Sequence, residues 1–155
     1  MADRLNDLEL AAWRGFLRSH ALLWRELEAS LERHHAISLG AYDVLVLLDE
    51  SPTGRMRMSE LAGAVLMTSG GFTRLADRLC AQGLATRERA AGDGRGFELV
   101  LTATGRELLE RARATHRADV RRGFLAHVDP ADQAWLAALW ERIAAEPVRT
   151  PAASS

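Results

Sequence analysis

The sequence has few residues that can form covalent cross-links. Its single cysteine, Cys80, excludes an internal disulfide and any metal site built only from cysteines. The fold must therefore be held together by packing. With 155 residues and 48% hydrophobic content, the chain is long enough for one compact domain with a real core.

Long apolar runs are also absent. No stretch approaches the roughly 18 apolar residues that a membrane-spanning helix needs. The first ten residues, MADRLNDLEL, are charged and lack the apolar centre of a signal peptide. We therefore expect a cytoplasmic protein without a membrane partner.

The motifs of common enzyme classes are missing as well. The chain contains no phosphate-binding Gly-Lys-Ser/Thr loop, no nucleophile elbow and no zinc-protease motif. His34 and His35 are adjacent, so they cannot readily share one ion, and no other group of potential ligands has regular metal-site spacing. We expect a protein that is not an enzyme and that holds neither a cofactor nor a metal.

Lysine is absent too, so every positive side chain except histidine is arginine, and the arginines are unevenly distributed. The net charge is -1, which argues against nonspecific polyanion binding. Residues 1–50 carry 5 arginines against 9 acidic residues, whereas residues 51–103 carry 7 against 5. The middle of the chain is therefore the relatively basic part.

Apolar periodicity predicts helices in the first half of the chain. Residues 7–33 form one long amphipathic pattern, and residues 41–50 form a largely buried helix that ends before the turn SPTGR. We predict that Ser59 caps a short helix and that a third helix runs from about Ser69 to Ala81, ended by Gly83. The short turn between these two helices makes them a helix-turn-helix candidate.

The pattern changes after Gly83. LATRERA and FELVLT predict a β-hairpin, joined by the glycine-rich AGDGRG. Long helices follow, from Thr104 to about His127 and again after the turn VDPADQ. We predict a mainly α fold with a small hairpin, forming a single domain over residues 1–155. Its central lobe spans about 36–103, between helices at about 5–34 and 104–146 that carry enough excess apolar surface to form a homodimer.

Residues 58–105 resemble the winged helix-turn-helix of MarR-type bacterial transcription regulators. The most specific sign is the wing, with Asp93-x-Arg95 followed by Leu101-Thr102 and Gly105. The resemblance implies a sequence-specific DNA-binding regulator that binds a pseudo-palindromic operator as a homodimer. It further implies a repressor or an activator of transcription, and many members release double-stranded DNA when a small effector binds; of the two we expect a repressor. The alternative is a winged-helix module that serves only protein association.

The third helix would present its N-terminal residues to base edges in the major groove. Arg74 and Thr73 are the predicted base readers, Arg78 the phosphate contact and Arg95 the minor-groove contact. Asp93 would fix the wing by orienting Arg95 or by pairing with Arg87 or Arg89. The predicted DNA-binding residues are Ser69, Gly70, Gly71, Thr73, Arg74, Arg78 and Arg95. In the competing interpretation the glycines tolerate an irregular first turn and the arginines are solvated surface.

An effector pocket is predicted from the resemblance alone. MarR-type pockets often lie between the dimerisation helices and the DNA-binding lobe, where His20, Trp24, Tyr42 and His116 would be available. The competing interpretation is that His20 and His116 are hydrogen-bonded residues of the core or of an interface.

Overall fold

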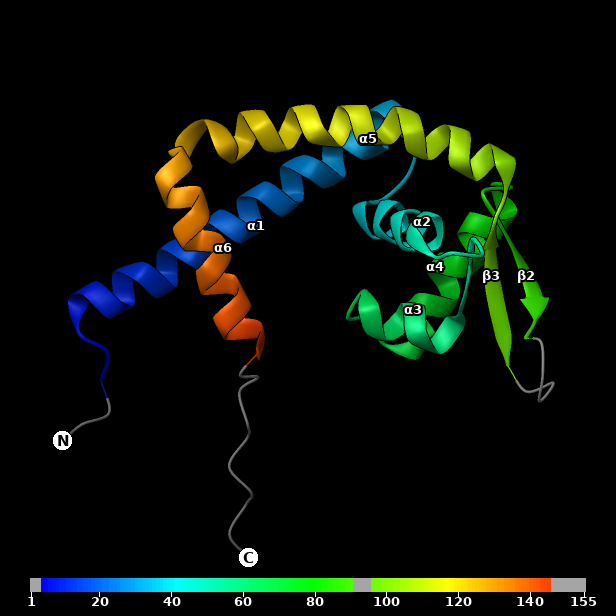
Figure 1. The fold of residues 1–155 in the computed structure, drawn as a ribbon, viewed down its shortest axis with the longest axis horizontal. Coiled ribbons are helices and arrows are strands. Elements are labelled where there is room, and N and C mark those ends of the chain that lie inside the picture. The colour runs from blue at the N-terminus through cyan, green and yellow to red at the C-terminus, as the bar shows by residue number, and fades with distance from the viewer. Residues whose placement is uncertain (1–3, 91–95, 146–155) are drawn as a thin grey trace, which may run out of the picture. The chain divides into compact units, whose positions relative to one another are not determined.

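The computed structural model describes residues 4–90 and 96–145 and is mainly helical, with one small antiparallel sheet (Figure 1). The chain divides into two compact units, residues 1–119 and 120–155. In chain order the elements are α1 (Asp7–His35), α2 (Leu39–Glu50), β1 (Arg55–Arg57), α3 (Met58–Ala64), α4 (Ser69–Ala81), β2 (Ala85–Arg89), β3 (Phe97–Leu101), α5 (Ala103–Gly123), η1 (Leu125–His127) and α6 (Pro130–Ala145). The predicted fold class is confirmed.

Helix α1 is fixed at its N-terminus by a capping box. The Asn6 side chain accepts a hydrogen bond from the Glu9 backbone N–H at 2.9 Å, and the Asn6 N–H donates to the Glu9 carboxylate at 2.7 Å. The helix ends at Ala36, which adopts a left-handed φ of +56°. Leu31, near this end, is fully buried, whereas Trp13 in the first half is 52% exposed.

The core of the first unit is built around α2. Val44, Leu45 and Leu48 are fully buried, which confirms that this helix is largely internal. They belong to one cluster with Phe72 and Leu79 of α4, Leu99 of β3 and Leu109 of α5. The hydrophobic interior therefore joins the predicted helix-turn-helix, the hairpin and the start of α5.

The sheet has three strands in the order β1-β3-β2, all antiparallel. The hairpin β2–β3 was predicted, but Arg55, expected at the end of a turn, instead begins strand β1. Strand β1 was missed because it is only three residues long and has arginine at both ends. Arg55 lies 3.4 Å from the Glu88 carboxylate and 3.5 Å from that of Glu98, so it bridges the other two strands.

The predicted cap of α3 is displaced. The helix begins at Met58, so Ser59 lies inside the first turn and does not cap it. The chain passes directly from β1 into the helix, and the Glu60 carboxylate accepts the Arg57 backbone N–H at 3.3 Å. That acidic side chain takes over the role that was predicted for the serine.

Both ends of α4 agree with the prediction. Thr68 caps the start, where its side chain accepts the Gly71 N–H at 3.3 Å. At the other end Gly83 adopts φ +70°, its N–H donates to the Cys80 carbonyl and the Leu84 N–H donates to the Leu79 carbonyl. This is a Schellman motif, which turns the chain sharply from α4 into β2.

Helix α5 starts in close contact with that turn. A Cβ atom on Gly105 would lie 2.0 Å from the Leu84 carbonyl oxygen and 2.9 Å from Leu101 Cδ1. Thr102 supports the same corner, because its hydroxyl donates to the Gly83 carbonyl at 2.7 Å and accepts from the Gly105 N–H at 2.9 Å. Only glycine allows the helix to approach this closely.

The second unit contains the end of α5, the 3-10 turn η1 and α6. The predicted continuous helix to His127 is wrong at its end, since α5 stops at Gly123, a residue that disfavours continued helix. Gln133 closes the next turn by donating its side-chain amide to the Val128 carbonyl at 3.0 Å. No helix in the described part of the chain is long and apolar enough to span a bilayer.

Candidate nucleic-acid interface

Helix α4 separates its side chains as the periodicity predicts. Phe72, Leu75 and Leu79 are buried against the core. Arg74 and Arg78 lie exposed on the other side, and among the described residues no acidic side chain forms an ion pair with either. Two guanidinium groups are thus available to an external anion.

The start of α4 is exposed to solvent and carries only small or polar side chains. Ser69 and Gly70 are exposed, and the exposed Thr73 donates its hydroxyl to the Ser69 carbonyl at 2.9 Å. That bond fixes the Thr73 oxygen toward its own backbone, which leaves its methyl group available for apolar contact. The free N–H groups of the first turn also favour negative charge.

The two glycines of the first turn differ in their surroundings. A Cβ on Gly71 would lie 3.2 Å from the Thr68 hydroxyl oxygen and 3.5 Å from the Met67 methyl carbon, so the capping threonine limits the space there. A Cβ on Gly70 would meet nothing within 4 Å. The protein's own packing therefore gives a reason for glycine at position 71 but none at position 70.

The segment that leads into α4 and forms its first two turns carries no negative side chain. From residue 61 to residue 76 the sequence contains no aspartate or glutamate. The next acid, Asp77, accepts a hydrogen bond from the Arg87 guanidinium at 2.9 Å. A polyanion approaching the start of α4 would therefore meet little repulsion.

Arg87 links the helix to the hairpin. Besides its contact with Asp77 of α4, its guanidinium carbon lies 6.0 Å from the centre of the Phe97 ring in β3. Asp93 and Arg95, predicted to orient and form the wing contact, lie outside the described residues. In the described chain the partner of Arg87 is thus Asp77, and the roles of the two tip residues stay predictions.

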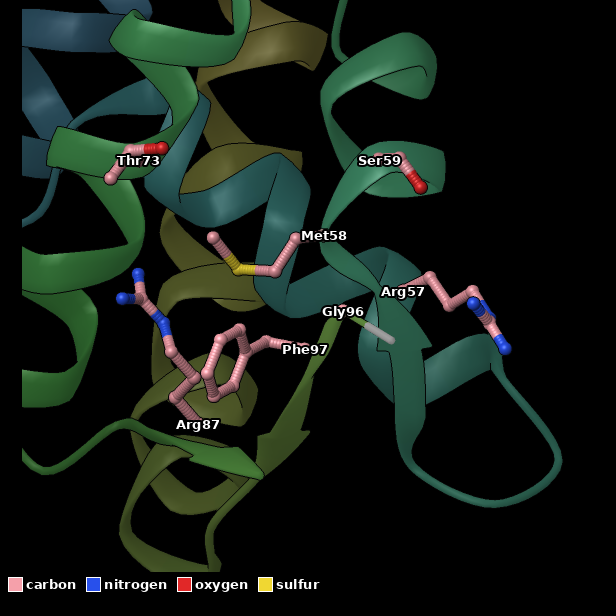
Figure 2. A pocket seen from close by; sticks show the side chains of 7 residues that line it. All are labelled: Arg57, Met58, Ser59, Thr73, Arg87, Gly96 and Phe97. Carbon is pink, nitrogen blue, oxygen red and sulfur yellow. The ribbon is translucent and has the colours of Figure 1, made fainter. Parts of the chain in front are cut away.

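A hollow of about 350 Å³ lies where β1, α3, α4 and the hairpin meet (Figure 2). Arg87 and Phe97 lie side by side in it, and Thr73 faces it from α4. Its remaining lining residues are Arg57, Met58, Ser59 and Gly96. Guanidinium and hydroxyl groups beside an aromatic ring suit an anionic or phosphate-bearing group. Sequence reasoning missed Arg57, Ser59 and Phe97 here, because only the three-stranded sheet brings their segments together.

The four predicted effector residues form two pairs. Tyr42 and His116 stack with ring centroids 4.6 Å apart, and His20 lies 5.9 Å from Trp24 on α1. His35, at the end of α1, shares a hydrogen bond of 2.8 Å with Thr115, next to His116. Because a helix rises 1.5 Å per residue, His20 is roughly 22 Å along α1 from that contact. The two pairs therefore do not line one pocket within a single chain.

Burial shifts the pKa values of Tyr42 and His116 in opposite directions. Desolvation lowers the pKa of His116 below its ordinary value, although Asp43 and Asp119 act in the opposite direction. Desolvation also raises the pKa of Tyr42 and of Asp43. The stack thus favours a neutral imidazole against a neutral phenol.

Among the described residues we find neither a metal-binding cluster nor an activated thiol. Within residues 4–90 and 96–145, no group of three or more His, Cys, Asp or Glu side chains is arranged to hold a metal ion. Burial raises the pKa of the Cys80 thiol, which disfavours the reactive thiolate.

Comparison with known proteins identifies the family. A search of curated protein sequences gives no match, but a sequence model of the MarR family matches residues 37–96. That segment contains α2, α3, α4 and β2 and therefore the whole candidate interface up to the hairpin.

Solved structures extend the similarity to nearly the whole chain. AbsC, a MarR family transcriptional regulator from Streptomyces coelicolor, is 34% identical with a TM-score of 0.86, over 92% of this chain and 96% of that one. Sco3205, a MarR family transcriptional regulator from the same organism solved in complex with DNA, is 30% identical with a TM-score of 0.88, over 96% and 95%. Sco5413, also from Streptomyces coelicolor, is 25% identical with a TM-score of 0.76, over 90% and 96%. The chain belongs to the MarR family of DNA-binding transcription regulators.

Proposed function

We propose that this protein is a homodimeric repressor that binds a pseudo-palindromic operator and releases it when a small effector binds. The observation that carries the proposal is the exposed face of α4. It combines an acid-free first turn with two arginines, Arg74 and Arg78, that no acidic side chain neutralises among the described residues.

The division of labour on α4 follows from chemistry. Arg74 lies in the second turn, close enough to the N-terminus to reach base edges, where a guanidinium can donate two hydrogen bonds to guanine. Arg78 lies one turn later, where contact with phosphate is expected. Thr73 offers its methyl group to a thymine methyl.

Exposed apolar side chains support the homodimer. On α1, Trp13, Leu17 and Trp24 are 52%, 46% and 47% exposed and share one face of the helix. In the second unit, Trp135 and Ile143 of α6 are 59% and 56% exposed. Burial of such large side chains against a second copy would stabilise the dimer.

The effector site is proposed at the Tyr42–His116 stack, with His20 and Trp24 as the alternative. In either pair, an aromatic ligand could stack on one ring in place of the other side chain, which would move aside. A thermal-shift screen of aromatic acids and their neutral analogues against wild type and Tyr42→Leu tests this. A ligand that stabilises both proteins equally, and still releases DNA, would exclude Tyr42 from the site.

The first test is selection of bound sequences from a random duplex DNA library by the purified protein. A dimer that reads two major grooves should enrich two related half-sites separated by about one helical turn. A protein-association module, the alternative function, should enrich no sequence.

Substitutions on α4 test the roles of the two arginines. Arg74→Ala should cost about 1 to 3 kcal/mol in operator binding and relax base preference at one position of each half-site. Arg78→Ala should weaken operator and random DNA alike and reduce the slope of log K against log salt by about 1. Fluorescence anisotropy at several salt concentrations measures both effects.

Arg25→Ala serves as the matched control, since it removes the same charge from the exposed side of α1. Equal losses on operator and random DNA for both α4 variants would refute the division of labour. An unchanged sequence preference in Arg74→Ala would show that Arg74 does not read a base.

A further inference from the structure

The turn between α3 and α4 holds an unusual leucine. Leu66 adopts φ +53°, in the left-handed region that branched side chains avoid, and its side chain is 93% exposed. Among the described residues only Leu66 and Ala36 combine a positive φ with a side chain. Asparagine or glycine would satisfy this backbone better than leucine does.

Folding does not account for this choice. The Leu66 side chain is the most exposed of the large hydrophobic residues of the described chain, so it adds almost nothing to the core. Its backbone N–H donates to the Gly63 carbonyl at 3.2 Å, a bond that any residue except proline could form. A residue that costs backbone energy and exposes apolar surface points to contact with something outside the protein.

The position of Leu66 suggests what that contact is. It lies two residues before Thr68, the N-cap of α4, in a run of exposed residues that includes Ser69 and Gly70. The partly exposed Met67, at 37%, extends the apolar surface toward the same helix start. No acidic residue occurs between residues 61 and 76. This favours DNA, which acidic side chains would repel, over a basic protein partner, which they would attract.

We propose that Leu66 is a DNA contact of the regulator, packing its side chain on apolar C–H surface at the edge of the groove entered by α4. The inference rests on the proposed operator binding. The surface it would meet is either a thymine methyl group or a deoxyribose. Because leucine carries no charge, this contact adds affinity without releasing counterions.

Two variants separate the contact from the fold. Leu66→Asn and Leu66→Gly both accept the left-handed backbone and remove the apolar group. Each should raise the melting temperature or leave it unchanged, and each should weaken operator binding about 5- to 10-fold per half-site, as expected for partial burial of a leucine. The salt slope should stay at the wild-type value, in contrast to Arg78→Ala.

Ala36→Asn is the matched control. Ala36 has nearly the same φ, +56°, and is exposed at the end of α1. Its substitution should have a similar effect on the melting temperature and none on operator affinity. An operator with deoxyuridine in place of thymidine then identifies the surface: the effect of Leu66→Asn disappears if a thymine methyl is the partner and persists if deoxyribose is.

The Leu66 contact and the proposed function would be refuted by different results. If wild type selects no DNA sequence, the proposed function fails. If wild type binds its operator, and both Leu66 variants bind it with unchanged affinity, the function stands and the Leu66 contact is overturned.

Discussion

At the scale of single residues, the neighbouring glycines of α4 have different explanations. Gly71 lies beneath the Thr68 cap, where a side chain would press on the hydroxyl that closes the helix. Gly70 faces open space. Glycine costs about 1 kcal/mol relative to alanine within a helix, and its position at the start of α4 leads us to predict that DNA uses the space at Gly70.

Gly70→Ala tests this reading. The variant should be more stable by about 0.5 to 1 kcal/mol, because alanine favours helix and meets no neighbour. It should bind operator about tenfold less tightly if DNA backbone approaches this position. Denaturant unfolding and anisotropy titration measure the two quantities.

Gly15→Ala is the control in α1, where a Cβ also meets nothing within 4 Å. It falls on the face of α1 opposite Trp13 and Leu17, so it should gain similar stability and keep full DNA affinity. A Gly70→Ala protein that binds like wild type would show that the space at position 70 is not used by DNA.

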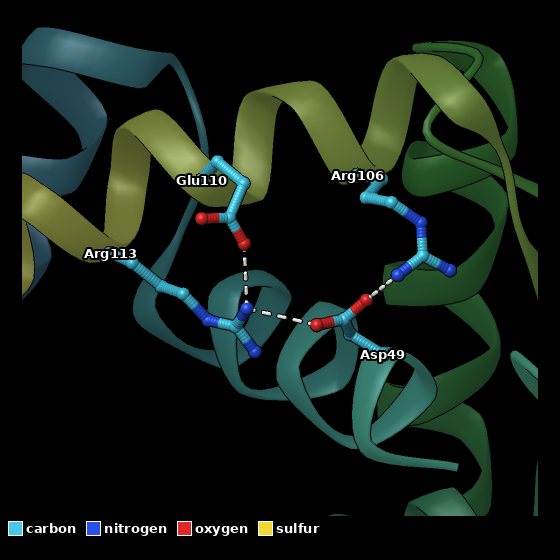
Figure 3. A network of polar contacts seen from close by, with 4 residues as sticks. All are labelled: Asp49, Arg106, Glu110 and Arg113. Carbon is cyan, nitrogen blue, oxygen red and sulfur yellow. Dashed lines mark hydrogen bonds and ion pairs between the residues drawn. The ribbon is translucent and has the colours of Figure 1, made fainter. Parts of the chain in front are cut away.

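At the scale of elements, the lobe is joined to α5 by a shared carboxylate (Figure 3). Asp49, at the end of α2, accepts hydrogen bonds from Arg106 and Arg113 of α5, the latter at 2.9 Å, and its side chain is only 13% exposed. Arg113 also bonds Glu110 at 2.7 Å. One largely covered carboxylate thus contacts two turns of α5.

Asp49→Asn should destabilise the protein by about 1 to 3 kcal/mol, because it removes the charge from two hydrogen bonds and leaves guanidinium groups partly unpaired. Urea unfolding at fixed protein concentration measures the change. Glu110→Gln is the control: its side chain is 63% exposed, so the loss should not exceed about 0.5 kcal/mol. Equal losses for the two variants would show that Asp49 is not the central partner.

Two histidines where α1 and α2 pack on α5 also predict a pH dependence of stability. Burial lowers the pKa of His116 and of His35 below the ordinary value of 6.5. Between the lowered pKa and 6.5 the unfolded chain binds more protons than the folded one, so stability is complete above 6.5 and falls as the pH decreases below it. Burial raises the pKa of Asp43 above its ordinary value of 3.8. Between these two values the folded chain binds more protons than the unfolded one, so this group adds stability as the pH falls.

His116→Phe keeps a ring against Tyr42 but cannot take up a proton. Its free energy of unfolding should therefore fall less between pH 7.5 and 5.5 than that of wild type. Urea titrations at four pH values give this comparison. A wild-type slope retained in the variant would assign the pH dependence to His35 or to another group.

Sequence patterns located most of these elements because each had a strong local cause. The apolar periodicity of Phe72 and Leu79 and the terminator Gly83 placed α4 without any tertiary information. Strand β1 could not be found this way, since Arg55 forms its strand only through pairing with β3 and ion pairs to Glu88 and Glu98. The Asp77–Arg87 pair and the hollow beside Phe97 likewise depend on contacts across distant segments.

At the scale of the whole molecule, each unit exposes apolar side chains that a soluble monomer would rarely leave in water. Those of α1 include Trp13 and Leu17, and those of α6 include Trp135 and Ile143. Their presence at both ends of the sequence agrees with the proposed dimer formed by the terminal helices.

The double variant Trp135→Gln/Leu139→Gln should raise the dimer dissociation constant about 100-fold or more, since large apolar side chains dominate such interfaces. Sedimentation velocity over a range of concentrations measures it. Ala137→Ser, on the opposite face of α6, should leave the constant unchanged. A double variant that remains dimeric at the lowest measurable concentration would place the interface elsewhere.

The close contact at Gly105 sets a limit on how this regulator can vary. Because even a methyl group there would overlap the Leu84 carbonyl, a library randomised at this codon and selected for operator binding should recover glycine almost alone. At Gly63, where a Cβ would meet nothing within 4 Å, the same selection should accept many residues. The corner between α4, β2 and α5 therefore tolerates almost no substitution. The exposed residues around it can be substituted, and such changes can alter which DNA sequence the protein binds.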